Sequence, residues 1–262
     1  MEAEEEKIVE HAKEAIHALT DKKKNWKAKI GSFLWEILII IIAVNLTIGF
    51  HNWNEKRHER ELEKEFLIGT RDDLDIIKND LDRRLMYYHQ PTLDYYNMVW
   101  KQINERRIDK TYVDSNSNRL LLADYFRYDN SRFESFKSSG YLRLIKNPAL
   151  LLDITHLYAD NFPTQVDWDH LLFNERRQGY IAYIAPKARI DSSGITYISD
   201  LLDIPEVKFQ IKWQRYLIRE NQSSKRELMR LVERIMGEID KELKDRFGYE
   251  FKKEEGKKQE KS

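Results

Sequence analysis

Two histidines and a glutamate lie at a spacing that metal sites use. His51, Glu55 and His58 would share one face of a helix, because they are spaced i, i+4 and i+7. Such a face offers three ligands, and a structural zinc site needs a fourth from elsewhere. The same residues directly follow an apolar stretch, where His, Asn, Trp and charged side chains commonly line a membrane surface. We interpret this segment as an interfacial collar. It consists of His51, Asn52, Trp53, Glu55 and Arg57.

Two further pairs, Asp153/His156 and Asp167/His170, are similar to the Glu-x-x-His pairs of di-iron bundles. Here the acids are the shorter Asp. With 45 Asp and Glu in the chain, matches at this spacing arise by chance. A membrane-tethered metalloenzyme built on these four residues is therefore the least favoured interpretation, and we expect no metal or other cofactor.

Other enzyme signatures are missing from the sequence. It has no Gly-x-Ser-x-Gly, no His-Glu-x-x-His and no phosphate loop ending in Gly-Lys-Ser/Thr. The absence of cysteine excludes disulfides and thiolate chemistry. Lys+Arg and Asp+Glu both number 45, which argues against a nucleic-acid binder. The sequence predicts a protein that is not an enzyme and has no catalytic residues.

One apolar stretch stands out from this polar chain. Between Ile30 and Phe50, 13 of 21 residues are Leu, Ile, Val or Phe. As a helix it is about 31 Å long, which matches a bilayer core. These residues contribute about -5 kcal/mol to insertion, against about +3 for one carboxylate at mid-helix. The alternative, a buried core helix, fits less well because Ile37–Val44 has no polar face. The sequence predicts a transmembrane helix at 30–50.

Small and polar residues form one stripe along this helix. Ser32, Glu36, Ala43 and Thr47 are spaced by four, seven and four residues. Membrane helices approach and hydrogen-bond one another through such stripes. We predict a helix–helix seam here, in a homo-oligomer or against a membrane protein partner. The alternative is a protonated or snorkelling Glu36 near the interface.

The charges on either side of the span predict its orientation. Five lysines lie just before it, and the basic residues after it are interleaved with Glu. This small excess favours a cytoplasmic N-terminus. We expect a single-pass protein of the bacterial cytoplasmic membrane, with residues 51–262 extracytoplasmic.

The rest of the 262-residue chain is predicted to be all-α. Residues 1–29 form a cytoplasmic amphipathic segment, with Val9, Ala12, Ile16 and Leu19 at coiled-coil spacing. Residues 51–250 form a helical bundle, and residues 251–262 a disordered charged tail. The transmembrane helix continues as a stalk into the bundle, where two long helices pack antiparallel.

The bundle's elements follow from periodicity and helix-breaking residues. The stalk buries a seven-residue repeat of Leu67, Leu74, Leu81, Tyr88 and Tyr95, and Pro91 interrupts it. The remaining elements are a linker at 107–118, helices at 119–128, 147–161, 165–184 and 206–247, a helical turn ending at Gly140, and a loop at 186–205. The last helix is expected to bury Phe209, Trp213, Leu217, Leu228, Leu231, Ile235, Ile239 and Leu243. Most aromatic side chains are expected in the core.

Two segments carry a resemblance to known proteins. They are Glu36 through His51-Asn52-Trp53-Asn54-Glu55-Lys56-Arg57 to Asp73-Leu74, and Phe133-Glu-Ser-Phe-Lys-Ser-Ser-Gly140 with Leu142 and Asn147. Together they resemble a family of uncharacterised bacterial single-pass membrane proteins. Trp35 and the long N-terminal extension depart from the family pattern. The resemblance implies a membrane-anchored helical protein and transfers no activity, ligand or site.

These observations give two main hypotheses of function. In the first, the protein is a non-enzymatic binding or scaffold subunit of a membrane complex. In the second, the bundle is an extracytoplasmic sensor that binds a small molecule and acts with a separate transducer. Neither requires nucleic acid.

Overall fold

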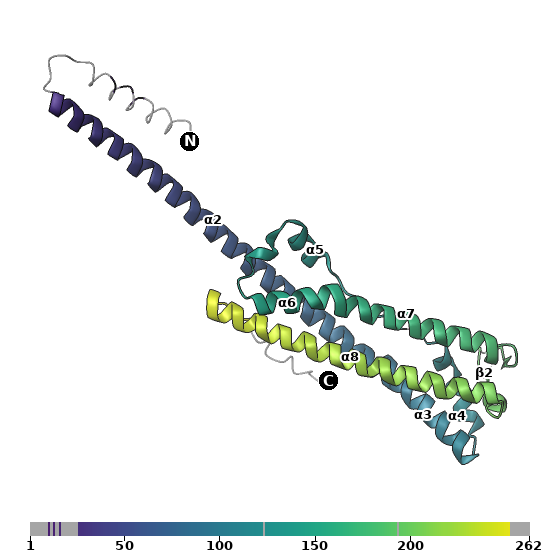
Figure 1. Ribbon diagram of the computed structural model, residues 1–262. Coiled ribbons are helices and arrows are strands. Elements are labelled where there is room, and N and C mark those ends of the chain that lie inside the picture. Colours follow the sequence, from purple (N-terminus) through teal and green to yellow (C-terminus); the bar gives the residue numbers. More distant parts are fainter. Residues whose placement is uncertain are drawn as a thin grey trace. The chain divides into compact units, whose positions relative to one another are not determined.

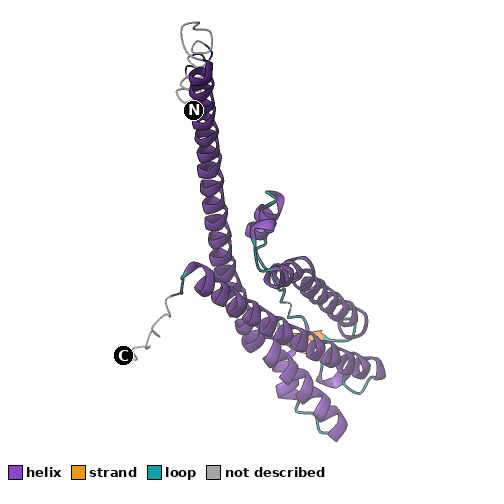
Figure 2. Ribbon diagram, turned by 60° about the vertical axis from the view of Figure 1, so that its left-hand side comes forward, coloured by secondary structure: helices purple, strands orange, loops and turns teal. Residues whose placement is uncertain are grey.

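The computed structural model describes Glu10, Lys13, Ile16 and residues 26–122, 124–192 and 194–251. Helices make up most of this part (Figure 1), so the all-α prediction is confirmed. The strands of the described residues, β1 (Arg189–Ile190) and β2 (Thr196–Tyr197), form a short antiparallel ribbon, orange in Figure 2. It lies within the loop predicted at 186–205. Most of the predicted amphipathic segment at 1–29 and the tail after Phe251 lie outside the described residues.

The chain divides into two compact units, Met1–Leu62 and Glu63–Ser262. Helix α2 (Trp26–Arg84) contributes residues to both. In the described part of the chain, one helical run is long and apolar enough to cross a membrane, and it contains most of the stretch predicted at 30–50. None of the residues in its most apolar window is buried. Side chains such as Ile41 and Leu46 are about half exposed.

The second unit is built around α3 (Gln90–Glu105), α7 (Phe162–Gly179) and α8 (Pro205–Phe247). Both α3 and α7 pack against α8. Polar contacts connect α2 and α3 to α8 in opposite residue order. As the residue number increases along α2 and α3, the number of the contacted residue in α8 decreases. These pairs are Glu63–Arg246 (2.6 Å), Arg71–Asp240 (3.2 Å), Lys78–Glu233 (3.1 Å), Gln90–Gln222 (2.8 Å) and Asn97–Arg215 (2.6 Å).

All five prolines have identifiable places in this helical framework. Pro148 and Pro205 are the first residues of α6 (Pro148–His156) and α8, where a missing N–H costs nothing. The other three each lie two residues after a π-helical turn. The turns are η1 (Leu85–His89) before Pro91, η4 (Leu157–Asn161) before Pro163, and η5 (Tyr180–Ile184) before Pro186. In each case the residue before the proline donates to the carbonyl five residues back. The wider turn gives the ring room that a regular α-helix denies it.

The first π-turn changes which residues of the stalk are buried. Leu67, Leu74, Leu81 and Tyr95 are buried as the seven-residue repeat predicts, but Tyr88 is 42 % exposed. Because the π-turn η1 inserts one residue, the buried position shifts from Tyr88 to His89. The helical run continues through Pro91, where the irregularity is the π-turn before it, and the prediction that Tyr88 is buried is wrong.

Shorter elements complete the second unit. The linker predicted at 107–118 contains α4 (Lys110–Ser115) and the 3₁₀ turn η2 (Ser117–Leu120). The helix predicted at 119–128 is wrong after Leu120, because backbone groups there bond to side chains of α7. The Phe126 N–H donates to Asp169 (2.6 Å), and the Leu122 carbonyl accepts from Arg176.

The helix boundaries around residue 140 follow the sequence signals. Helix α5 (Ser131–Ser138) ends before Gly140, whose φ of 71° is the left-handed conformation that glycine adopts freely. The 3₁₀ turn η3 (Tyr141–Leu144) follows. Asn147 then caps α6 by accepting from the Leu150 N–H at 3.2 Å.

Helix α8 has the predicted length but a different buried face near its start. Phe209 and Trp213 are 62 % and 37 % exposed, so their prediction as core residues is wrong. Alternating steps of four and three residues, with a final step of four to Leu243, describe most of the buried face: Val207, Ile211, Gln214, Ile218, Asn221, Lys225, Leu228, Val232, Ile235, Ile239 and Leu243. Three members are polar, so a search for apolar residues alone selects the neighbouring face.

Candidate functional site

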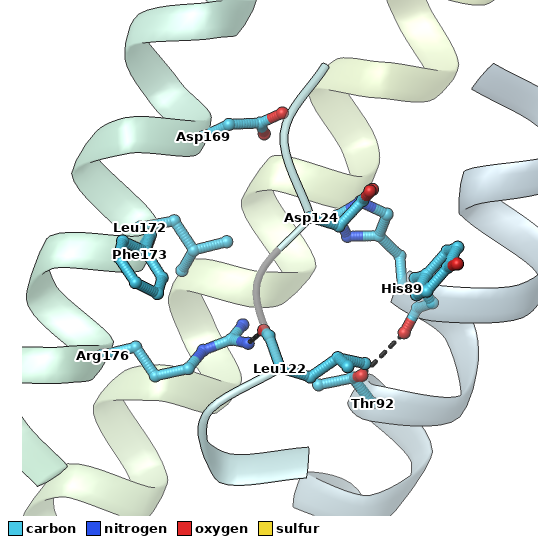
Figure 3. A pocket seen from close by; sticks show the side chains of 9 residues that line it. His89, Thr92, Leu122, Asp124, Asp169, Leu172, Phe173 and Arg176 are labelled. Atoms are coloured by element: carbon cyan, nitrogen blue, oxygen red, sulfur yellow. Dashed lines mark hydrogen bonds and ion pairs between the residues drawn. The ribbon is translucent and has the colours of Figure 1, made fainter. Parts of the chain in front are cut away.

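Five ionisable side chains meet inside the second unit. They come from the end of α2, from η1, from the loop after η2, from α7 and from α8, and we call them the charged cluster. Its members are Arg84, His89, Asp124, Asp169 and Lys225. Figure 3 shows three of them, His89, Asp124 and Asp169, around a small cavity. The cluster therefore connects the junction of α2 and η1 with three segments distant from it in sequence, the loop after η2, α7 and α8.

Lys225 is at the centre of the charged cluster and has no exposed surface. Its Nζ lies 2.9 Å from Asp169 Oδ2, 2.7 Å from His89 Nε2 and 3.9 Å from Asp124 Oδ2. Burial lowers the pKa of Lys225, while the neighbouring carboxylates act in the opposite direction.

Asp169 is the best-satisfied carboxylate of the charged cluster. Besides Lys225, it accepts from the Phe126 N–H, from Asn221 Nδ2 at 2.8 Å and from Gln165 Nε2 at 3.1 Å. Both oxygens of this buried carboxylate therefore have hydrogen-bond or ion-pair partners. It therefore fixes the loop before Phe126 against α7 and α8.

Asp124 and His89 form the other half of the charged cluster. Arg84 contacts Asp124 Oδ1 and also pairs with Asp80. Burial favours the neutral form of Asp124, but the contact with His89 and the charges of Lys225 and Arg84 outweigh it and lower the pKa of this carboxyl. Burial lowers the pKa of His89, and the positive charge of Lys225 adds to this effect.

One nitrogen of His89 faces both a donor and an acceptor. Nε2 lies 2.7 Å from the Lys225 ammonium and 3.2 Å from the Asp124 carboxylate. Without a proton, Nε2 accepts from Lys225; with a proton, it donates to Asp124. The proton at this atom therefore decides whether η1 is bonded to α8 or to the loop.

The cavity beside the charged cluster is small. It measures about 20 Å³, which is room for one water molecule, and its lining includes His89, Asp124, Asp169 and Arg176. Arg176 points toward the Leu122 carbonyl (Figure 3) and donates to it through Nη1. A cavity of this size can hold a water molecule hydrogen-bonded to the polar side chains around it, and it is too small for an organic substrate.

A larger groove lies elsewhere on the same unit. It encloses about 770 Å³ between α2 and the loop before α5. Ile76, Ile77 and Tyr128 supply apolar surface. The charged side chains of the lining have both signs: Arg83, Arg127, Asp73, Asp80 and Asp129. Volumes of about 300–1,000 Å³ are typical of small-molecule sites.

An exposed aromatic row lies on α8. Phe209, Trp213 and Tyr216 are spaced i, i+4 and i+7 and are 62 %, 37 % and 46 % exposed. The rings of Trp213 and Tyr216 stack with centroids 5.7 Å apart, and Arg219 lies 5.9 Å from the centroid of Tyr216. We call these three residues the aromatic face.

The predicted membrane residues all fall on α2. In the stripe predicted as a seam, Glu36 and Ala43 are half-buried and Thr47 is exposed. The Thr47 hydroxyl donates to the Ala43 carbonyl at 2.9 Å. The side chain of Ser32 lies outside the described residues. The collar residues are exposed, and the guanidinium carbon of Arg57 lies 5.9 Å from the ring centroid of Trp53.

Two of the residues considered for a metal site have other contacts. Asp153 pairs with Arg234 at 2.7 Å, and the ring of His170 packs against that of Tyr125. In the part of the chain that the structure describes, no group of three or more His, Cys, Asp or Glu side chains could hold a metal ion.

The charged cluster is not predicted by the apolar pattern of the sequence, although one signal for it exists. Lys225 and Asn221 occupy positions of the four-three repeat that otherwise carries Leu, Ile and Val in α8. A lysine at such a position is rare unless a carboxylate pairs with it. The partners Asp124 and Asp169 have no comparable signal, because their contacts join distant segments.

Comparisons with known proteins give no relative. No family model matches the chain, no characterised protein matches it, and no solved structure matches it. Its function is therefore inferred from the residues and contacts described above.

Proposed function

We propose that this protein is a single-pass subunit of a bacterial cytoplasmic-membrane complex, whose helical unit binds a protein partner without catalysis. Its N-terminus is cytoplasmic, residues 30–50 span the bilayer, and an antiparallel bundle lies outside. The apolar stretch of α2 supports the anchor. The opposite residue order in the contacts between α2 or α3 and α8 supports the bundle.

The aromatic face is the observation that carries the binding role. Large aromatic side chains are rarely left exposed in a row, and Trp, Tyr and Arg dominate the energetics of protein interfaces. The neighbouring side of α8 packs against α3 and α7, so this row is available to a partner.

Purification of the full-length protein from native membranes in mild detergent tests this role. We expect a stoichiometric protein companion that is lost when Phe209→Ser and Trp213→Ser are combined. Ile190→Ser, at an equally exposed apolar side chain on β1, serves as the matched control and should retain the companion. A companion that stays bound to the Phe209/Trp213 variant contradicts the assignment.

The membrane seam is a separate part of the proposal. Ser32, Glu36, Ala43 and Thr47 would bring two copies, or a partner's helix, together in the bilayer. Glu36→Leu should weaken association in a membrane two-hybrid assay, whereas Leu38→Ile should not. If the Glu36 variant associates as strongly as the wild type, the proposed seam is contradicted.

The groove of about 770 Å³ favours a second function, a sensor that acts with a separate transducer. Its apolar side chains and its charged groups of both signs suit a small amphipathic molecule. A screen of such compounds against the full-length protein should find one whose binding raises the melting temperature. Arg127→Gln should reduce this effect, and Arg230→Gln, on an outer face of α8, should not.

A further inference from the structure

A second small cavity adjoins the first through a shared residue, Arg176. It measures about 10 Å³, and Tyr96, Gln210 and Gln214 contribute to its lining. None of its lining residues is acidic. A cavity of this size accepts a single water or a single-atom ion and excludes polyatomic metabolites.

Arg176 is a buried cation without a counter-charge. Its side chain is 7 % exposed, and its bond from Nη1 goes to a neutral carbonyl, that of Leu122. No ion pair to Arg176 is found among the described residues, whereas the buried Lys225 pairs with Asp169. Burial lowers the pKa of Arg176, and Tyr96 opposes this effect. An arginine nevertheless stays protonated in proteins.

Unpartnered polar atoms converge on this cavity. Among buried side-chain atoms in the described residues, Arg176 Nε, Gln210 Oε1, and both Nε2 and Oε1 of Gln214 lack a hydrogen-bond partner. A half-turn of a glutamine amide exchanges its oxygen with its NH₂, so both glutamines can direct donors into the cavity.

Gly179 makes room for this arrangement. A Cβ at this position would lie 2.3 Å from Gln210 Oε1. The glycine therefore allows the Gln210 amide to approach α7 beside the guanidinium.

We propose that Arg176 and the amides of Gln210 and Gln214 bind one single-atom monovalent anion, chloride under ordinary conditions, in this cavity. A buried charge left uncompensated is strongly unfavourable, and water alone leaves the formal charge in place. Chloride neutralises it and accepts from several N–H donors at once. The acids of the neighbouring cavity do not compete for the guanidinium, because Asp169 and Asp124 are paired with Lys225 and Arg84.

Chloride exchange on the full-length protein in detergent tests the proposal. At constant ionic strength, chloride is replaced by gluconate, which is too large for the cavity. At chloride concentrations above the dissociation constant of the site, each tenfold rise in chloride concentration should raise the melting temperature of the protein by about 3–5 °C. The NMR line of chloride should broaden in the presence of the protein, because bound chloride exchanges with free chloride. Bromide should reverse this broadening by competing for the same site.

Two variants and one control make the outcome specific. Arg176→Met should abolish the broadening, and Gln214→Glu should do so while keeping the fold, because it places a carboxylate beside the guanidinium. Arg234→Met, at a half-exposed arginine of α8, should leave the broadening unchanged. The proposal is overturned if chloride and gluconate give the same melting temperature, or if the Gln214→Glu protein broadens the line as the wild type does.

Discussion

Lys225 shows how a single residue organises the second unit. Removing an ammonium group from water costs several kcal/mol, and only close partners recover this cost. Lys225 has them in Asp169 and His89, at 2.9 and 2.7 Å. Because each partner comes from a different element, a shift of α8 along its axis would break both contacts. The charged cluster therefore fixes the position of α8 along α7 and η1.

Lys225→Met tests the energetic role of the charged cluster. The change leaves Asp169 buried without its ion pair, so we expect the free energy of unfolding to fall by about 3–5 kcal/mol. Urea denaturation of the full-length protein in detergent measures this. Adding Asp169→Asn, which removes the orphaned charge, should recover part of the loss. Lys212→Met, at an exposed lysine of α8, should cause little change, and an equal effect of both lysine variants would contradict the interpretation.

The pH dependence of stability follows from His89. Burial lowers the pKa of His89 below its ordinary value of 6.5. As pH falls through 6.5 the unfolded chain binds a proton that the folded protein does not, so the free energy of unfolding decreases until the lower folded pKa is reached. Denaturation at several pH values between about 7.5 and 5 should show this slope. His89→Gln should flatten it, whereas His170→Gln should not.

At the scale of elements, three π-turns accompany the prolines that do not begin a helix. Each of η1, η4 and η5 precedes an internal proline, and the chain continues in helical form on both sides of η1 and η4. The first of them places His89 among the buried residues. A regular helix there would place Tyr88 inside and leave the charged cluster without its histidine.

Apolar periodicity and helix-breaking residues predict most of the helices but not the charged cluster. The stalk, α6, α7 and α8 follow from apolar spacing and from Asn147-Pro148 and Gly140. No local signal opposes a helix at 121–128. Backbone groups of this segment bond instead to Asp169 and Arg176, which are more than 40 residues away. Such long-range competition has no signature in a single sequence, and the same is true of Asp124.

Substitutions at two helical glycines distinguish the effect of intrinsic helix propensity on stability from that of side-chain packing. A Cβ added at Gly237 of α8 would meet no atom within 4 Å, so Gly237→Ala should raise the free energy of unfolding by about 0.5–1 kcal/mol. At Gly69 of α2 a Cβ would lie 2.1 Å from Arg132 Nη1. Gly69→Ala should therefore displace Arg132 from Asp73, 2.7 Å away, and cancel the gain. Equal stabilisation by both substitutions, measured by urea denaturation, would contradict this packing argument.

At the scale of the whole molecule, one apolar stretch contrasts with a chain that is 34 % charged. In the described residues its large apolar side chains are exposed to about half of their surface, while the second unit has its own buried core. A hydrophobic surface of this extent needs a nonaqueous environment or a partner.

Two arginines in this stretch should prevent insertion. The apolar residues contribute about -5 kcal/mol, and each arginine at the centre costs about 3 kcal/mol. We therefore expect Ile40→Arg combined with Ile41→Arg to move the protein out of the carbonate-resistant membrane fraction. Ile40→Leu with Ile41→Leu is the control and should stay there. Retention of the double-arginine variant in the membrane would mean that another part of the chain anchors it.

The pairing of prolines with π-turns has a consequence for how such sequences are compared. Each added residue rotates everything that follows by about 100° around the helix axis. The hydrophobic signal of the chain therefore keeps its period but changes phase shortly before Pro91 and Pro163, where a helix continues beyond the π-turn. An alignment of related chains should tolerate single-residue gaps at these two places when the proline is lost as well. A periodicity search that permits a phase step there would place His89, rather than Tyr88, on the inner face.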